Sequence, residues 1–232
     1  MIALLGFWGK SHLYWQAVST ESSFAIVAEI LFHGLFVASL AAYVISLWGE
    51  NQKFRARSFA SSVLCGLAGL LLSAHGFYQA PLWTFETFIY PIAFFLSALL
   101  LGTVTVGMLL GHWYLIDTGQ SLDPFIRIYK FFVVALVVQT TFLFISMILL
   151  YAFGVSGSVI ALRGLWTDHT TLLSTRVIAG QAAPLILSWM IWRTLVIPHT
   201  MAATGLFYIA LLSVFVGEIL GKQILALTSL PF

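Results

Sequence analysis

The stretch FIRIYKFFVVALVVQTTFLFISMILLYAF, from Phe125 to Phe153, decides the fold of this chain. After Lys130 it carries no charged residue. It is longer than the roughly 20 apolar residues that an α-helix needs to cross the hydrocarbon core of a bilayer. Asp123 and Pro124 precede it, and proline disfavours helix in the residue before it. The stretch therefore predicts a transmembrane helix that starts near this Asp-Pro pair.

Apolar stretches of similar length lie on both sides of it, separated by short polar, proline-containing or glycine-containing breaks. Counted along the chain, the expected helices cover about 23–48, 58–78, 88–114, 125–153, 172–195 and 199–227. Residues 1–22 are aromatic and roughly amphipathic, so we expect this segment to lie along the membrane surface; the alternative is a frayed terminus. The sequence thus predicts an all-α fold: a polytopic integral membrane protein with a bundle of about six transmembrane helices and a short N-terminal interfacial segment. We expect one transmembrane domain over 1–232.

The composition agrees with a protein that lipid surrounds. Hydrophobic residues make up 61% of the chain and charged residues 8%, whereas soluble domains carry about 25% charged residues. The net charge of +2 is too small to indicate a nucleic-acid partner. Cys65 is the only cysteine, which excludes an intrachain disulfide and a self-contained iron–sulfur cluster. No phosphate loop, CxxC, HExxH or nucleophile elbow is present, so we do not expect an enzyme that works alone.

The lysines and arginines near the helix ends predict the orientation. Six of them flank one side and three the other, and the richer side normally faces the cytoplasm. The six are Lys53, Arg55, Arg57, Arg127, Lys130 and Arg193, and the three are Lys10, Arg163 and Lys222. We therefore expect both termini on the non-cytoplasmic side, in a bacterial or archaeal inner membrane.

Ionisable residues inside the expected helices are the candidate functional groups, because charges in a bilayer are costly and usually serve a purpose. In the predicted orientation the outer half of the membrane holds Glu29, His33, His75, Arg176 and Glu218. Glu29 and His33 are four residues apart and share a helix face. We expect the Glu29 carboxylate to hold the ring N–H of His33. All five groups are expected to converge.

Arg176 and Glu218 lie on neighbouring predicted helices and are of opposite charge, so they form a plausible ion pair. Together with Glu29 they allow two interpretations. The first is a quinone or proton site, because quinol oxidation needs a hydrogen-bonding group that also accepts a proton. The second is a structural ion-pair network that joins the first, fifth and sixth helices.

Four histidines suggest haem b, whose iron takes axial histidines from facing helices at matched depth. His33 with His75 is the outer candidate pair of iron ligands, and His112 with His199 is the inner one. The alternative is that these histidines hydrogen-bond other helices or sit at the membrane interface. Both haem b and quinone are hypotheses at this point.

The plan of the chain is similar to that of cytochrome b-type membrane anchors of respiratory complexes, in architecture and not in motif. This resemblance implies a membrane anchor subunit of a respiratory or photosynthetic electron-transfer complex, with other membrane subunits, a redox protein and lipid as partners. Two alternatives stay open: a cofactor-free structural subunit of a membrane complex, and a small transporter or proton channel that uses Glu29, Arg176 and Glu218. Architecture alone does not choose among them.

Overall fold

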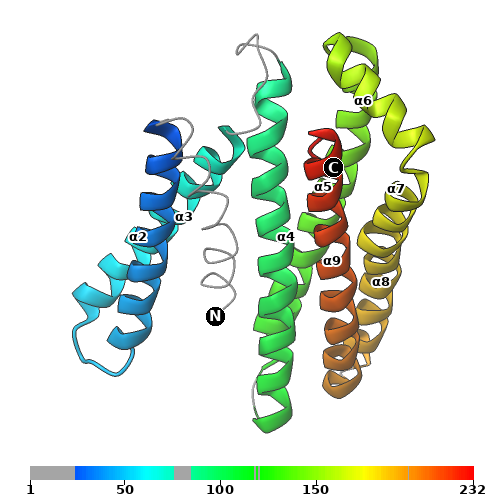
Figure 1. Cartoon of the computed structure of the whole chain (residues 1–232). Coiled ribbons are helices and arrows are strands. Elements are labelled where there is room, and N and C mark those ends of the chain that lie inside the picture. Colours follow the sequence, from blue (N-terminus) through cyan, green and yellow to red (C-terminus); the bar gives the residue numbers. More distant parts are fainter. Residues whose placement is uncertain (1–23, 76–84, 118, 120, 198) are drawn as a thin grey trace. The chain divides into compact units, whose positions relative to one another are not determined.

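The structure is a computed structural model, and it describes residues 24–75, 85–117, 119, 121–197 and 199–232. The expected interfacial segment 1–22 lies outside these residues. All elements in the described ranges are helices, which confirms the predicted all-α membrane bundle (Figure 1). In chain order they are α2 (Phe24–Ser46), α3 (Gln52–His75), α4 (Phe85–Ile116), α5 (Asp123–Phe153), α6 (Ser156–Thr167), α7 (Thr170–Val177), η1 (Ile178–Ala182), α8 (Ala183–Val196) and α9 (Thr200–Thr228).

Five of these helices are long and apolar enough to cross a membrane: α2, α3, α4, α5 and α9. The sixth expected helix corresponds to three consecutive pieces, and none of them is long enough to cross a membrane by itself. α7, η1 and α8 follow one another without a break from Thr170 to Val196, and the backbone stays in the helical region at Val177 and Ala183. They form one helix with a π-helical turn in its middle.

The π turn has a local cause. Pro184 lies at the start of α8, and a proline lacks the N–H that would bond the carbonyl four residues earlier, here that of Gly180. Its ring also crowds that carbonyl, and a π turn is one way a helix accommodates such a disruption. Gly180 and Gln181 are the buried residues of this turn.

Two features differ from the sequence prediction. α3 begins at Gln52, so Lys53, Arg55 and Arg57 lie in its first turns and not in a loop. Arg55 donates hydrogen bonds to the carbonyl oxygens of Ser46 and Gly49, which ties the start of α3 to the end of α2. In addition, α6 occupies a region between the fourth and fifth expected spans for which the sequence predicted no helix.

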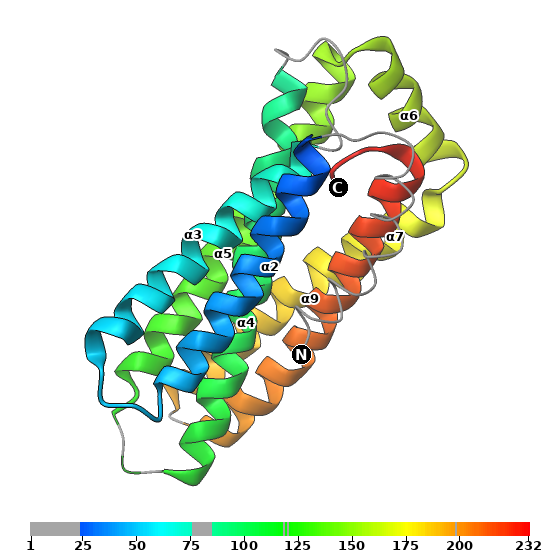
Figure 2. The ribbon, with the colours of Figure 1, turned by 60° about the vertical axis from the view of Figure 1, so that its left-hand side comes forward.

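The chain divides into two compact units at Pro91, a proline inside α4. The first unit, residues 1–91, contains α2 and α3, which pack along each other (Figure 2). The second unit, residues 92–232, contains most of α4 and all later helices. The expected single domain stays a prediction.

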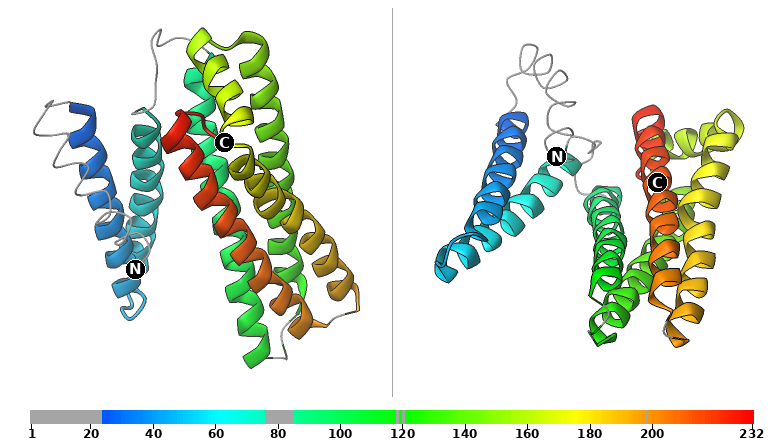
Figure 3. Two further views of the ribbon diagram at one scale, coloured as in Figure 1. Left: turned by 45° about the vertical axis from the view of Figure 1, so that its right-hand side comes forward. Right: turned by 90° about the horizontal axis from the view of Figure 1, so that it is seen from below.

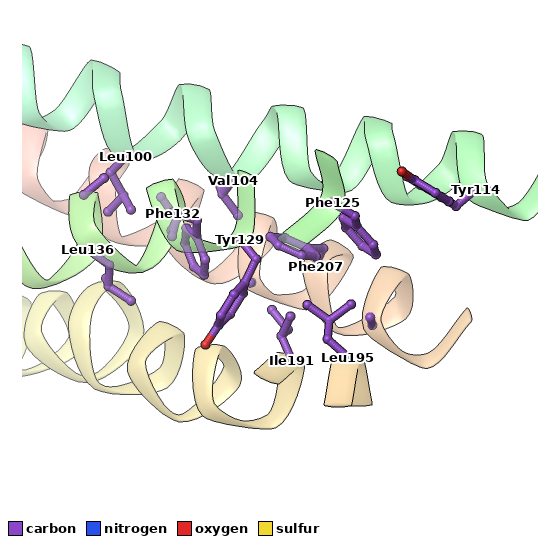
Figure 4. Packing of buried hydrophobic residues seen from close by; sticks show 14 residues of the cluster. Leu100, Val104, Tyr114, Phe125, Tyr129, Phe132, Leu136, Ile191, Leu195 and Phe207 are labelled. Atoms are coloured by element: carbon purple, nitrogen blue, oxygen red, sulfur yellow. The ribbon is translucent and has the colours of Figure 1, made fainter. Parts of the chain in front are cut away.

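The second unit has a well-packed apolar core contributed by α4, α5, α8 and α9 (Figure 4). The ribbons of these helices are drawn from two further directions in Figure 3. Phe207 of α9 is the centre of the core, with ring centroids 5.5 Å from Phe125 and 5.7 Å from Phe132. Gly107 of α4 makes room for it, because a Cβ there would lie 2.5 Å from the Phe207 ring. This core holds α4 against α9, and the two helices therefore carry the polar side chains described next at fixed positions.

Candidate functional site

Glu218 is the centre of a buried polar cluster in the second unit. It lies on α9 with 9% of its surface exposed, and three other helices each supply one donor to its carboxylate. Arg176 of α7 forms an ion pair with it, Nη2 to Oε1, at 3.2 Å. Gln139 of α5 donates from Nε2 to Oε1 at 2.7 Å. Ser97 of α4 donates from its hydroxyl to Oε2. Helices distant in the sequence thus converge on one carboxylate.

Three glycines provide the space that the Arg176 guanidinium occupies. A Cβ on Gly180 or Gly217 would come closer than 3.0 Å to its Nη1, and one on Gly221 would lie 3.0 Å from its Nε. These glycines come from the π turn and from α9. Gly217 and Gly221 are four residues apart, a spacing that indicates close helix packing. The same two glycines also border the Arg176 side chain.

The cluster does not satisfy all of its own hydrogen-bonding groups. Arg176 is 3% exposed, yet its Nε and Nη1 have no hydrogen-bond partner among the described residues. The same holds for Oε1 of Gln139 and, one turn of helix beyond Arg176, for Nε2 of Gln181. Buried polar groups in proteins are nearly always paired. Two unpaired donor nitrogens on a buried cation and one unpaired acceptor therefore indicate that a small polar molecule completes the site.

A cavity of about 30 Å³ lies beside Arg176 and Gln139. Four of its lining residues belong to the polar cluster around Glu218: Ser97, Gln139, Arg176 and Glu218 itself. The other lining residues are mostly apolar or aromatic. They are Ala93, Phe94, Phe142, Leu143, Gly221, Lys222, Leu225, Pro231 and Phe232. Such a combination, an apolar lining with a few convergent polar groups, is typical of ligand-binding sites.

Lys222 and Phe94 border this cavity and contact each other. The Lys222 Nζ lies 3.6 Å from the centroid of the Phe94 ring, in a cation–π contact. Lys222 is exposed, whereas Phe94 is buried. Lys222 lies one helical turn after Glu218 on α9. Lys222 and Phe94 therefore mark the exposed end of the cavity.

The first unit brings Glu29 and His33 together, but not in the way we expected. His33 Nδ1 lies 3.0 Å from the backbone carbonyl oxygen of Glu29, which can only accept. The Glu29 carboxylate accepts instead from the hydroxyl of Ser73 on α3 at 2.5 Å. The expected carboxylate–imidazole contact is therefore wrong, because the carbonyl one turn earlier already holds the ring.

The His33 ring packs against α3 at Gly69, where a Cβ would lie 3.2 Å from it. With the proton on Nδ1, the neutral ring presents Nε2 as its acceptor and metal-ligating atom. The side chain of His75 lies outside the described part of the structure, so the His33–His75 pair stays a prediction. The convergence of Glu29, His33 and His75 with Arg176 and Glu218 also stays one, since these residues belong to different units.

The inner histidines have other contacts. His112 is exposed, and its Nδ1 lies 3.3 Å from the Tyr208 hydroxyl of α9. His199 is the residue before α9, and its carbonyl accepts from the amide of Ala203 in the first turn. Their shared role as haem ligands stays a prediction. No group of three or more metal-ligating side chains exists in the described ranges, but a haem iron needs only two.

Sequence reasoning missed Ser97, Gln139 and Gln181. Uncharged polar residues occur in many membrane helices, so none of these stood out by itself. A usable signal exists for Gln139, which is the only glutamine within the apolar 125–153 stretch and whose neighbour Thr140 is also polar. Thr140 donates to Oε1 of Gln181 at 2.5 Å.

No family model, curated protein or solved structure matches this chain. The functional interpretation therefore depends on the geometry of the site.

Proposed function

We propose that this chain is a membrane anchor subunit of an electron-transfer complex, and that the Arg176–Glu218 cluster is the place where it exchanges a proton with a quinone. The observation that carries the proposal is the set of buried, unpaired polar atoms around one carboxylate. A cluster that served only to hold helices together gains nothing from leaving two nitrogens of a buried guanidinium without a protein partner, since each unbonded N–H costs free energy.

The cluster has the chemistry that quinol oxidation needs. Conversion of a quinol into a quinone releases two protons and two electrons. We assign one proton to Glu218, whose carboxylate borders the cavity, and the other to water at the cavity's exposed end. The two electrons would leave one at a time, and a bound haem b or a redox centre of a partner protein would supply that one-electron chemistry. Arg176 stabilises the negative charge of Glu218 before the proton arrives, because their atoms are 3.2 Å apart.

Haem b is the cofactor we propose for the first unit. His33 fits one requirement of an axial ligand: a carbonyl holds Nδ1, which orients the ring and leaves Nε2 for a metal. If a haem is bound, it supplies the one-electron chemistry that a quinone couple requires. The role of this chain is to hold the imidazole ring of His33 against Gly69 of α3.

A cofactor-free structural subunit is the second candidate, and one observation favours it. The ion pair and the glycine contacts join α7 and α9 directly, so the cluster also holds the bundle together. The two candidates differ in whether anything besides protein occupies the site.

The location follows in part from the fold. The apolar helices embed the chain in a membrane. We propose a bacterial or archaeal inner membrane with both termini on the non-cytoplasmic side, supported by the six-to-three distribution of basic residues.

Quinone content tests the proposed function. The protein is purified in a mild detergent from membranes that contain quinone, and bound quinone is extracted and measured per chain. We expect up to one bound quinone per chain in the wild type and a large loss of bound quinone in Glu218→Gln. Gln223→Leu, an exposed change on the same helix, should retain the wild-type amount. An absence of quinone from the wild type, with no uptake of added quinone, would favour the structural subunit.

A further inference from the structure

We infer that the cavity beside Arg176 and Glu218 takes the headgroup of the quinone, with Arg176 and Gln139 as its polar contacts, and that the headgroup enters between Phe94 and Lys222. The inference rests on the proposed function and adds the ligand's contacts and its entrance.

The unpaired atoms of the site match the two forms of a quinone headgroup. The oxidised form presents carbonyl oxygens, which only accept hydrogen bonds, and the reduced form presents hydroxyls, which also donate. Nε and Nη1 of Arg176 are donors without a partner, and Oε1 of Gln139 is an acceptor without one. Both side chains line the cavity and are more than nine-tenths buried. The site therefore offers a contact to a carbonyl and a contact to a hydroxyl.

The rest of the lining suits a flat aromatic ring. Phe94, Phe142 and Phe232 border the cavity with their apolar surfaces, and aromatic rings pack well against one another in offset or edge-to-face arrangements. Gly221 allows the chain to pack closely beside Arg176, since a Cβ there would lie 3.0 Å from Nε and 2.5 Å from the backbone oxygen of Phe232. A ligand with polar ends and an apolar ring uses both kinds of surface.

The cavity must widen before such a ring fits. At about 30 Å³ it has room for a water molecule or two, whereas sites for small organic ligands usually measure about 300–1,000 Å³. The side chains that can move most easily are those at the exposed end. Lys222 is exposed and long, and it meets Phe94 through a cation–π contact, which is weak at exposed sites. We infer that the cavity widens where these two side chains separate from each other and from the other groups that they contact.

Photolabelling locates the ligand. The full chain in lipid nanodiscs is illuminated with a short-chain azido-benzoquinone, and the labelled residues are identified by mass spectrometry. We expect label in segments 93–97 and 218–225 that is removed by excess unmodified quinone. Competed label confined to other segments would overturn this location and the assignment of the cluster, while the role of the chain as a quinone-binding anchor would stand. A wild-type protein that takes up no quinone by any measure would overturn the proposed function itself.

The entrance is tested through rates. Lys222→Met keeps most of the length of the side chain and removes its charge, and Phe94→Leu removes the aromatic ring. Both should raise the association and dissociation rates of the short-chain quinone several-fold, with a smaller change in equilibrium occupancy. Gln139→Leu should instead lower the affinity by about tenfold, the size of one lost hydrogen bond to a buried group. Gln223→Leu is the matched control and should behave as the wild type. Unchanged rates in both entrance variants would overturn the entrance.

Discussion

Gly180 of the π turn and Gly217 of α9 bring two helices into direct backbone contact. A Cβ placed on Gly180 would lie 2.8 Å from the Gly217 Cα, and one placed on Gly217 would meet the Gly180 Cα even more closely. The same two glycines border the Arg176 guanidinium. The position of the buried charge therefore depends on a backbone contact that no larger residue permits.

Alanine at either glycine should destabilise the protein. Gly180→Ala and Gly217→Ala each force backbone against backbone, and overpacking of this kind typically costs about 1–3 kcal/mol. Gly205→Ala is the matched control on the same helix, because nothing lies within 4 Å of its Cβ position. Denaturation in mixed detergent, followed by circular dichroism, measures the effect. Equal stability of all three variants would contradict the close contact.

The ion pair between Arg176 and Glu218 should appear as energetic coupling. Glu218→Gln leaves a buried cation without its partner, and breaking a buried pair in this way costs roughly 3–5 kcal/mol. The double variant with Arg176→Gln should recover part of the loss, with a coupling of about 0.5–3 kcal/mol. Glu50→Gln, at an exposed carboxylate, should have little effect. Additive losses in the unfolding free energies would show that the pair contributes no coupling.

Much of the fold could be predicted from the sequence because membrane helices have a simple physical signature. The apolar length of 125–153 required a spanning helix, and the cost of burying Arg176 and Glu218 separately predicted that they meet. Other features lack such a signature. The α6 helix is too short and too mixed in composition to stand out. The π turn depends on how Pro184 is accommodated, and alternatives to a π turn exist at any internal proline.

The polar cluster was only half predictable for a related reason. A charged residue in a membrane helix can be recognised in the sequence because its burial costs much free energy. Burial of Ser97 or Gln139 costs little once the side chain is hydrogen-bonded, so the sequence gives little indication of these residues. At Glu29 the prediction left out a second acceptor that competes with the carboxylate for the ring N–H of His33. The backbone carbonyl four residues before His33 is always within reach in a helix, and it holds the ring while the carboxylate bonds Ser73.

Cysteine labelling tests the proposed orientation. In a Cys65→Ala background, Lys53→Cys and Thr167→Cys place single thiols at two exposed positions. A membrane-impermeant maleimide should reach Lys53→Cys only from the cytoplasmic side and Thr167→Cys only from the opposite side. Each variant is labelled in both right-side-out and inverted vesicles. Reaction of both thiols from one side would reject the six-span topology.

A reduced-minus-oxidised absorption spectrum tests the proposed haem. We expect a b-type signal in the purified wild type and its loss in both His33→Ala and His75→Ala at unchanged protein levels, because an axial ligand cannot be replaced by a methyl group. His169→Ala, which changes a histidine just before α7, should keep the signal. A wild type without haem, or a signal that survives either ligand variant, would remove this pair.

The proton exchange at Glu218 is measured most directly by infrared difference spectroscopy of the protein with bound quinone. Electrochemical reduction and oxidation of the quinone should produce a difference band from the carbonyl of a protonated carboxylic acid. The band should gain intensity when the quinol is oxidised, because Glu218 then takes the proton. It should be absent in Glu218→Gln and present in Glu29→Gln and Gln223→Leu. A quinone signal with no carboxyl band, or a band that persists in Glu218→Gln, would contradict the assignment of Glu218 as the proton acceptor.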